Sequence, residues 1–279
     1  TSKIAPLNWT MPYSGANKAA FRPASPYAQC LLRVQDDSST PTSAGGRWAK
    51  WRGYETMTDV DTGTGLFPTA AQAANGLSVF KSSTGDSTER HWWLAGDAGL
   101  FYFGTFWHAS YLTLAGMVAF GDCNSLRSGD AYSSLIIAEP LDTLSGSPWS
   151  NNAFGALGTI SAAQSGHYLA RAYPQTGSAV AAGKIGDNAV SSALGNGGLA
   201  YPHPPDNGLL FAPVGLCESG VLRSRALPGL YQPLHTTPLA YLDTLTGLAD
   251  LPGRILQAFD LTASTARGQC LIDIIGPWR

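Results

Sequence analysis

Short runs of aromatic and β-branched residues, separated by clusters of turn-forming residues, are the feature that most constrains the fold of this chain. Its 32 glycines and 18 prolines break the sequence too often for long helices, and no strong helical period links the runs. The pattern predicts an all-β protein with a β-sandwich or barrel-like body and long loops. Strands are predicted at Ala28–Val34, Arg47–Met57, Leu77–Lys81, Arg90–Ala95, Leu100–His108, Tyr111–Phe120, Tyr132–Ala138, Tyr168–Tyr173, Leu209–Val214, Val221–Ala226, Arg254–Ala263 and Gln269–Ile275.

The first 27 residues contain four prolines and little periodicity. They are predicted to form an extended N-terminal arm, residues 1–27, that packs along the body or reaches a neighbour. Residues 28–279 are then the all-β body. A segment rich in Ser, Asn, Gly and Ala at 141–166 is interpreted as a long excursion between sheets, where the body would divide if it consists of two β subdomains.

Charge and hydropathy exclude several partner classes. With 17 Lys and Arg against 19 Asp and Glu, the formal net charge is −2, and only 13% of the residues are charged. This composition is not that of a protein that binds nucleic acid or an anionic membrane. No apolar run approaches 18 residues, and the first 30 residues lack the basic start and apolar stretch of a Sec signal. We expect no membrane span, and folding in the cytoplasm.

The four cysteines, Cys30, Cys123, Cys217 and Cys270, are far apart in the sequence and form no local metal-binding motif. They are predicted to be small buried residues with free thiols. The five histidines show no metal-binding spacing, and there is no Gly-rich phosphate loop. No cofactor and no metal are therefore expected.

No motif predicts catalysis. The G-x-S-x-G nucleophile motif is absent. The run from Asp59 to Gly65 superficially resembles a calcium loop, but Ala70 stands where the EF-hand has its bidentate Glu, so an Asx-type turn is favoured. Asp122 and Asp130 each follow a glycine; a carboxylate pair could serve a glycosidase, but turns are the preferred interpretation. The protein is not expected to be an enzyme.

The most distinctive local feature is an aromatic hairpin predicted over Arg90–His108, with its turn at Gly96–Gly99, where glycines permit positive φ. Neighbouring residues of a strand face opposite sides, so this hairpin is apolar on both faces. Three interpretations are open: a central strand between two packed layers, an aromatic protein interface, or a sugar-stacking platform. The candidate interface residues are Trp92, Trp93, Phe101, Phe103, Trp107 and Trp278.

The C-terminal segment predicts one more strand pair, formed by Arg254–Ala263 and Gln269–Ile275 around a turn at Ser264–Gly268. Leu271 and Ile272 face opposite sides of the last strand, which is typical of a strand inside a sheet. Trp278 follows Pro277 and is predicted to pack against the body or a neighbouring subunit as an end plug.

Several of these segments carry a family resemblance. They are Gly208–Val214, Leu227–His235, Gly253–Leu256 and Leu271–Arg279, together with Arg52–Glu55, Asp59–Gly63, Phe120–Asp122 and Gly129–Tyr132. In these strand and turn signatures the chain resembles virion proteins of transposable, Mu-like long-tailed bacteriophages and their prophages. The resemblance covers most of the chain from about Ala28 onward and leaves the N-terminal arm unplaced.

This resemblance implies a structural component of a phage tail tip or baseplate, located in the virion after folding in the host cytoplasm. Its implied partners are other tail or baseplate proteins, further copies of itself in a threefold or sixfold arrangement, and a host surface receptor. The resemblance assigns no functional residues. The alternative from another class is a carbohydrate-binding or carbohydrate-cleaving β-sandwich, which would need exposed Trp rings and, for cleavage, a close carboxylate pair.

Overall fold

The computed structural model describes residues 7–36, 47–82, 88–108, 111–140, 166–184, 199–218, 220–235, 239–260 and 269–279; of residues 47, 107, 108 and 111–116 it describes the backbone. Over these residues the protein is all-β, with about 49% strand in several antiparallel sheets and no helix. The described residues accordingly contain no helix long and apolar enough to cross a membrane. The predicted fold class is confirmed.

The first sheet contains seven strands from the N-terminal part of the chain, in the order β1-β2-β3-β4-β6-β11, with β5 paired to β4. Strand β4 is the longest and pairs with three neighbours, so it holds this sheet together. The strands are β1 Thr10–Gly15, β2 Lys18–Arg22, β3 Leu31–Asp36, β4 Arg47–Met57, β5 Gly63–Phe67, β6 Leu77–Ser82 and β11 Glu139–Pro140.

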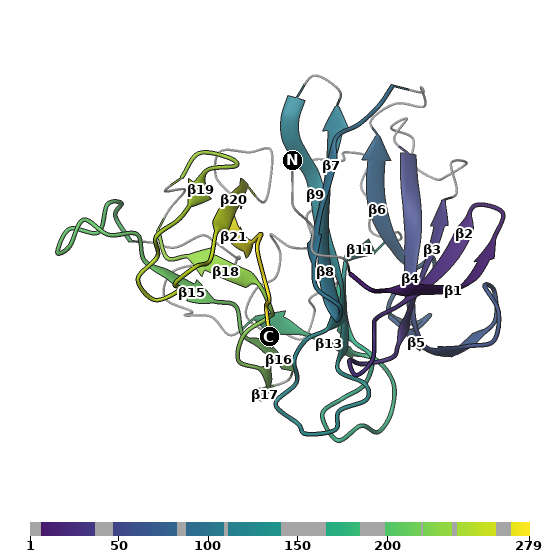
Figure 1. Ribbon diagram of the computed structural model, residues 1–279. Helices are drawn as coiled ribbons and strands as arrows, with labels where there is room; N and C mark the ends of the chain where they lie inside the picture. The colour runs from purple at the N-terminus through teal and green to yellow at the C-terminus, as the bar shows by residue number, and fades with distance from the viewer. Residues whose placement is uncertain are drawn as a thin grey trace.

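The central sheet has six strands in the order β13-β12-β10-β9-β8-β7. They are β7 Trp92–Gly96, β8 Leu100–His108, β9 Tyr111–Asp122, β10 Ser134–Ile137, β12 His167–Leu169 and β13 Val180–Ala181. This sheet is the middle layer of the molecule, with the first sheet on one side and the C-terminal strands on the other (Figure 1).

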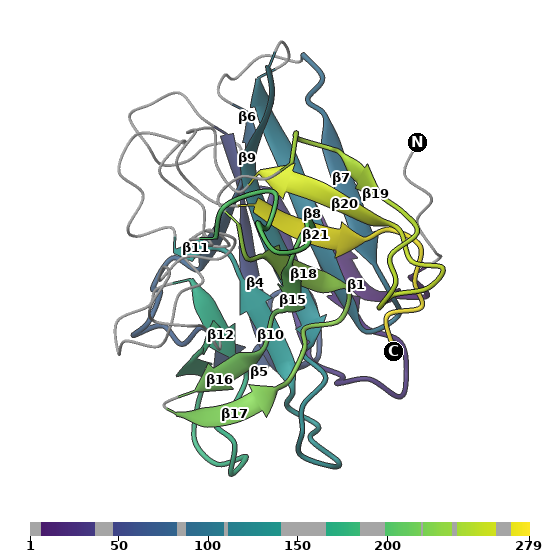
Figure 2. The ribbon, with the colours of Figure 1, turned by 90° about the vertical axis from the view of Figure 1, so that its left-hand side faces the viewer.

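The C-terminal part forms two smaller sheets. One has the order β14-β16-β17, with β14 Gly183–Lys184, β16 Leu216–Glu218 and β17 Val221–Ser224. The other has the order β15-β18-β21-β20-β19, with β15 Phe211–Pro213, β18 Leu230–Pro233, β19 Thr244–Leu245, β20 Leu256–Asp260 and β21 Gln269–Asp273. Figure 2 shows these strands in front of the central sheet.

Two apolar cores separate the three layers, because successive side chains of β8 to β10 point to opposite faces. Leu100, Tyr102 and Leu135 face the C-terminal strands, whose buried members include Leu230 and Ile272. The intervening residues face the first sheet in a second core, which includes Phe101, Phe120, Ile136, Trp51 and Leu77. Of the three interpretations of the aromatic hairpin, a central strand between two packed layers is therefore the one observed for most of its length.

The N-terminal segment differs from the extended arm predicted for residues 1–27. Strands β1 and β2 form an antiparallel hairpin, and β2 pairs with β3, so residues 10–22 extend the first sheet. Asn17, with a φ of 57°, lies in the tight turn between them. The prolines that suggested an arm lie outside these two strands except for Pro12, which is in the edge strand β1, where a missing N–H is tolerated. Residues 1–6, and the proposed split near 141–166 except for residue 166, lie outside the described part.

The predicted Arg90–His108 hairpin is confirmed, but the reason given for its glycines is wrong. Strands β7 and β8 pair from Trp92 with Thr105 to Gly96 with Phe101, around the turn at 97–99. Neither Gly96 nor Gly99 has a positive φ. They are required by close packing instead: a Cβ at Gly99 would lie 2.8 Å from the Tyr27 ring, and one at Gly96 would lie 2.8 Å from Leu7.

The C-terminal strand pair is also confirmed, and β21 lies inside its sheet between β18 and β20. The turn predicted at Ser264–Gly268 lies outside the described residues. Trp278 packs on the body as predicted: its ring centroid is 5.4 Å from that of Tyr102, and its Nε1 donates to Asp273 O at 2.9 Å. Gly229 makes room for this ring, since a Cβ there would lie 2.3 Å from it.

Replacing Trp278 by Ala should lower the free energy of unfolding by about 2 kcal/mol, roughly half the usual cost for a fully buried Trp, because the ring is half-buried. Urea unfolding followed by circular dichroism measures this cost. Trp92→Ala is the matched control, since Trp92 is 62% exposed and its loss should cost under about 1 kcal/mol. Equal costs for the two variants would contradict the end-plug assignment.

Candidate functional site: an aromatic groove

A groove of about 800 Å³ lies between the first sheet and the hairpin β7–β8. Its floor and walls are mainly apolar, and polar side chains stand at its mouth. The lining residues are Leu7, Asn8, Trp9, Thr10, Met11, Phe21, Leu32, Val34, Asp36, Ala49, Trp51, Val79, Lys81, Arg90, His91, Trp92, Leu94, Phe101, Phe103 and Thr105. This volume is in the range of ligand-binding sites in proteins.

Strand alternation builds the aromatic wall of the groove. Register places Leu94 opposite Phe103 and Gly96 opposite Phe101, so these residues and Trp92 share the face toward the first sheet. The Phe103 ring centroid lies 6.1 Å from that of Trp92 and 6.4 Å from that of Trp51. The rings thus form a continuous row from the buried Trp51 to the exposed Trp92.

The mouth of the groove carries charges that are already engaged. Lys81 forms an ion pair with Asp36 across strands β6 and β3. Arg90 donates to the carbonyl oxygens of Thr88, at 2.7 Å, and Glu89, at 3.3 Å. Since the floor offers few hydrogen-bonding groups, the groove presents mainly apolar surface.

Five of the six candidate interface residues are divided between the two faces of the central sheet. Trp92, Phe101 and Phe103 line the groove. Trp93 points to the opposite side, where its ring stacks on Phe259 at 4.3 Å, and Trp278 packs on the same side. The side chain of Trp107 lies outside the described part of the structure.

Most of the groove residues were not among the candidates, and Trp51, Trp9 and Met11 are three examples. Trp51 could have been found by alternation within its predicted strand, where it shares a face with Ala49. Trp9 and Met11 could not, because the segment that carries them was interpreted as an arm. Trp9 is held by a hydrogen bond from its Nε1 to Asp97 O at 3.0 Å, and its ring lies 5.1 Å from that of Phe101.

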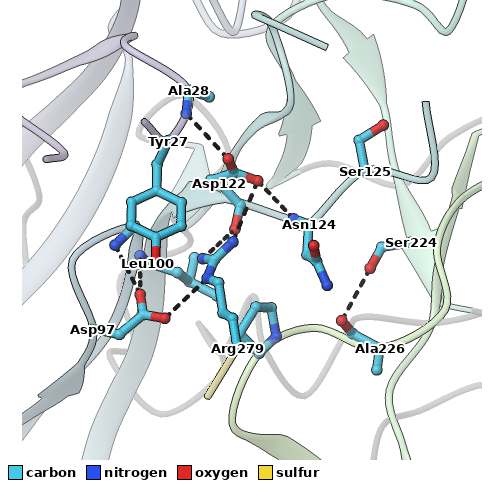
Figure 3. Close-up of polar contacts among 12 residues, drawn as sticks. Tyr27, Ala28, Asp97, Leu100, Asp122, Asn124, Ser125, Ser224, Ala226 and Arg279 are labelled. Carbon is cyan, nitrogen blue, oxygen red and sulfur yellow. Dashed lines mark hydrogen bonds and ion pairs between the residues drawn. The ribbon is translucent and has the colours of Figure 1, made fainter. Parts of the chain in front are cut away.

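A second, polar site lies at the other end of the β7–β8 hairpin (Figure 3). The Arg279 guanidinium lies between two carboxylates: its Nε is 2.9 Å from Asp97 Oδ2, and its Nη1 is 3.5 Å from Asp122 Oδ1. It also stacks on the Tyr27 ring at 4.6 Å. Burial acts to lower the pKa of Arg279, but the hydrogen bond and charge of Asp97, with the charge of Asp122, outweigh it and raise the pKa.

A polar pocket of about 490 Å³ lies beside the contacts of Arg279 with Asp122 and Tyr27. Tyr27, Asp122, Arg127 and Asp130 are among its lining residues. The turns predicted at the two Gly-Asp pairs are present, because Asp122 accepts from Asn124 N at 2.7 Å and Asp130 from Tyr132 N at 3.0 Å. The arginines that bind these carboxylates come from distant parts of the chain and were not predicted.

The most buried charge belongs to Arg223, whose side chain is fully buried. Its Nη1 lies 2.7 Å from Glu218 Oε2 and its Nη2 lies 3.0 Å from Asp130 Oδ2. Nη1 also donates to Arg171 O at 2.9 Å, and Arg171 itself pairs through two nitrogens with Glu55 of β4. This chain of contacts ties β17 to the central sheet's loops and to the first sheet.

The Asp59 turn is of the predicted Asx type. Asp59 Oδ1 accepts from the backbone N–H groups of Asp61, at 2.7 Å, and Thr62, at 2.8 Å. These bonds, that of Asp61 foremost, lower the pKa of Asp59. Asp61 pairs with Lys18 and Arg33, so both carboxylates have protein partners. The described residues contain no group of three or more His, Cys, Asp or Glu side chains able to hold a metal.

All four cysteines have free thiols, as predicted. Cys123 and Cys270 lie in the core facing the C-terminal strands, and Cys30 lies in the other core. Burial raises the pKa of Cys30 to about 12 and also raises the pKa of Cys123 and of Cys270 far above the ordinary value. Cys217 is half-buried, and its pKa is raised by the same cause.

Comparison with known proteins adds no family assignment. The chain matches no protein-family model, and a search of curated proteins gives no match.

Replacing Arg223 by Met should lower the free energy of unfolding by about 3–5 kcal/mol, because Asp130 and Glu218 would remain buried without a cation. Chemical denaturation measures the effect. Lys18→Met breaks the exposed pair with Asp61 and serves as the control, with an expected cost under about 1 kcal/mol. A cost that small for Arg223→Met would show that the cluster does not depend on its cation.

Thiol labelling of the folded protein with an aromatic disulfide at about pH 8 should modify Cys217 first and leave the other three cysteines unmodified until the protein unfolds. Burial excludes the reagent and keeps these thiols protonated. Mass spectrometry of peptides identifies the labelled sites, and Cys217→Ser should remove the early labelling. Rapid native labelling of Cys123 or Cys270 would contradict the packing described.

Proposed function

We propose that this protein is a structural subunit of a bacteriophage tail tip or baseplate, and that it acts by binding neighbouring subunits through the aromatic groove. The observation that carries the proposal is the open end of the groove, where Trp92 is 62% exposed although it continues a row of packed rings. Exposed aromatic residues beside a buried apolar floor are typical of protein interfaces. The resemblance to tail virion proteins supports the same class.

The partner proposed for the groove is an extended apolar segment of a neighbouring tail subunit. Strand β7 is the edge strand of the central sheet among the described residues, so its outer backbone groups are available to pair with an added strand. Such a segment would place alternate side chains over Trp92 and Leu94. At the mouth, Lys81 and Asp36 neutralise each other and Arg90 carries one positive charge, which favours a segment with at most one acidic residue.

Carbohydrate binding is the second candidate, and the polar pocket is the observation that favours it. Sugar hydroxyls need hydrogen-bond partners beside an aromatic ring. The polar pocket offers Tyr27, Arg127 and two carboxylates, whereas the groove is mainly apolar. Both carboxylates pair with arginines, Asp130 with Arg223 and Asp122 with Arg279, which favours ligand binding over acid-base cleavage.

In the virion, we propose assembly with other tail or baseplate proteins in a threefold or sixfold ring, as the resemblance implies, with contact to a host receptor as a further role. Repetition around such an axis would present one groove per subunit to its neighbour. Imaging of intact particles with labelled protein tests the location. A strictly monomeric chain that is absent from particles would contradict the proposal.

The variants Trp92→Ala and Phe103→Ala should each reduce incorporation into particles by at least about tenfold, because truncating an interface aromatic commonly costs 2 kcal/mol or more of binding. Quantitative mass spectrometry of purified particles measures incorporation. Tyr201→Ala is the control, since Tyr201 is 49% exposed and lies outside the groove. Unchanged incorporation of both groove variants would remove the groove from the interface, and glycan binding lost with Arg127→Ala would support the second candidate.

A further inference from the structure

We propose that His235 is a pH-sensitive clip that closes the base of the loop at residues 199–210. This loop projects from the C-terminal sheet and leads into β15 (Figure 1, left). His235 follows β18, and its side chain is fully buried. The clip is a regulatory device separate from the groove, so it does not depend on the proposed function.

The two ring nitrogens of His235 join the two ends of the loop. Nδ1 lies 2.7 Å from Ala200 O, and Nε2 lies 2.8 Å from Leu210 N. A carbonyl oxygen only accepts and a backbone N–H only donates, so Nδ1 must carry a hydrogen and Nε2 must carry none. The closed loop therefore requires the neutral Nδ1–H form of the ring.

The tip of the loop is held by its own hydrogen bonds. His203 N donates to Gly208 O at 3.1 Å, Asn207 N donates to His203 O at 2.7 Å, and the Asp206 carboxylate accepts from Gly208 N at 2.9 Å. At the base, Leu199 N donates to Leu234 O at 3.2 Å. Leu234 N also donates to Leu210 O at 2.9 Å. Opening of the base therefore breaks these two backbone bonds together with the bonds of His235, while the tip keeps its own bonds.

A proton on Nε2 would break the clip. The nitrogen would become a donor facing the Leu210 N–H, so this hydrogen bond would be lost and a positive charge would be buried with only the Ala200 carbonyl bond to offset it among the described contacts. When the loop opens, water can solvate the charged ring. The open form therefore binds more protons than the closed form, and acidification favours opening while neutral pH favours closure.

Three titratable groups of the described residues lie near the ring: Tyr201, His203 and Asp206. The Tyr201 ring lies 5.5 Å from that of His235, and the His203 ring lies 6.5 Å away. Asp206 Oδ1 is 2.9 Å from His203 Nδ1, and the pKa of Asp206 is lowered by its bonds to Gly208 N and then to His203. Asp206 is therefore engaged with both Gly208 and His203.

Hydrogen exchange of the full chain, measured by mass spectrometry on peptides covering residues 199–211, tests the clip. After correction for intrinsic exchange rates, the opening equilibrium should rise by up to about tenfold per pH unit between about pH 7.5 and about pH 5. The variant His235→Gln, which stays neutral, should show a flat profile. The matched control His203→Gln should keep most of the pH dependence.

The variant His235→Gln is uninformative if it opens the loop at every pH. In that case nitrogen NMR of the wild-type protein, which reports the tautomer and the protonation of the His235 ring, decides the test. The Nδ1–H tautomer at neutral pH, with ring protonation coinciding with the rise in exchange, supports the clip. An Nε2–H tautomer, pH-independent exchange in the wild type, or loss of the pH dependence only in His203→Gln would overturn it.

Discussion

The structure depends on one constraint: strands β8 and β9 are apolar on both faces, so the central sheet must be covered on both sides. Different parts of the chain cover the two faces of the central sheet. Its first third supplies the sheet that covers Phe101 and Phe120, and its last third supplies the strands that cover Tyr102 and Leu135. The central sheet covers one face of each outer sheet, and each outer sheet buries part of its other face in a small cluster of its own, around Leu31 and Tyr54 in the first sheet and around Leu256 and Leu271 in the C-terminal sheet. The short C-terminal strands are stable as a layer because of this support.

Polar contacts then fix how the layers sit against each other. A repeated arrangement uses both oxygens of an aspartate: Oδ1 accepts backbone N–H groups of a turn, and Oδ2 binds an arginine from another part of the chain. The pairs are Asp97 with Arg279, Asp130 with Arg223, and Asp273 with Arg254. Each turn therefore acts both as a chain reversal and as an anchor for a distant segment. Because the Arg223 pair is buried, it is the one whose loss should cost most.

Sequence patterns predicted the local features well and the long-range ones poorly. The all-β class, the hairpin over Arg90–His108, the Asx turn at Asp59 and the position of Trp278 all follow from alternation and turn chemistry. The β1–β2 hairpin was missed because prolines outside its strands dominated that segment. The groove was predicted in part: Trp92 was identified, but which of two adjacent tryptophans points outward depends on the layer that covers each face. Arginine partners such as Arg223 for Asp130 depend on tertiary folding, which residue spacing does not encode.

The groove follows from the same two-sided constraint. The first sheet covers Phe101 almost completely, leaving it 9% exposed, but at the far end of the hairpin Trp92 extends beyond the covering strands. An exposed Trp adds little to the free energy of unfolding. If the row of rings served stability alone, we would expect it to end where the first sheet stops covering it. Here the row continues on an edge strand that can accept a further strand. Under the proposed function, a contact made outside this chain would account for the position of Trp92.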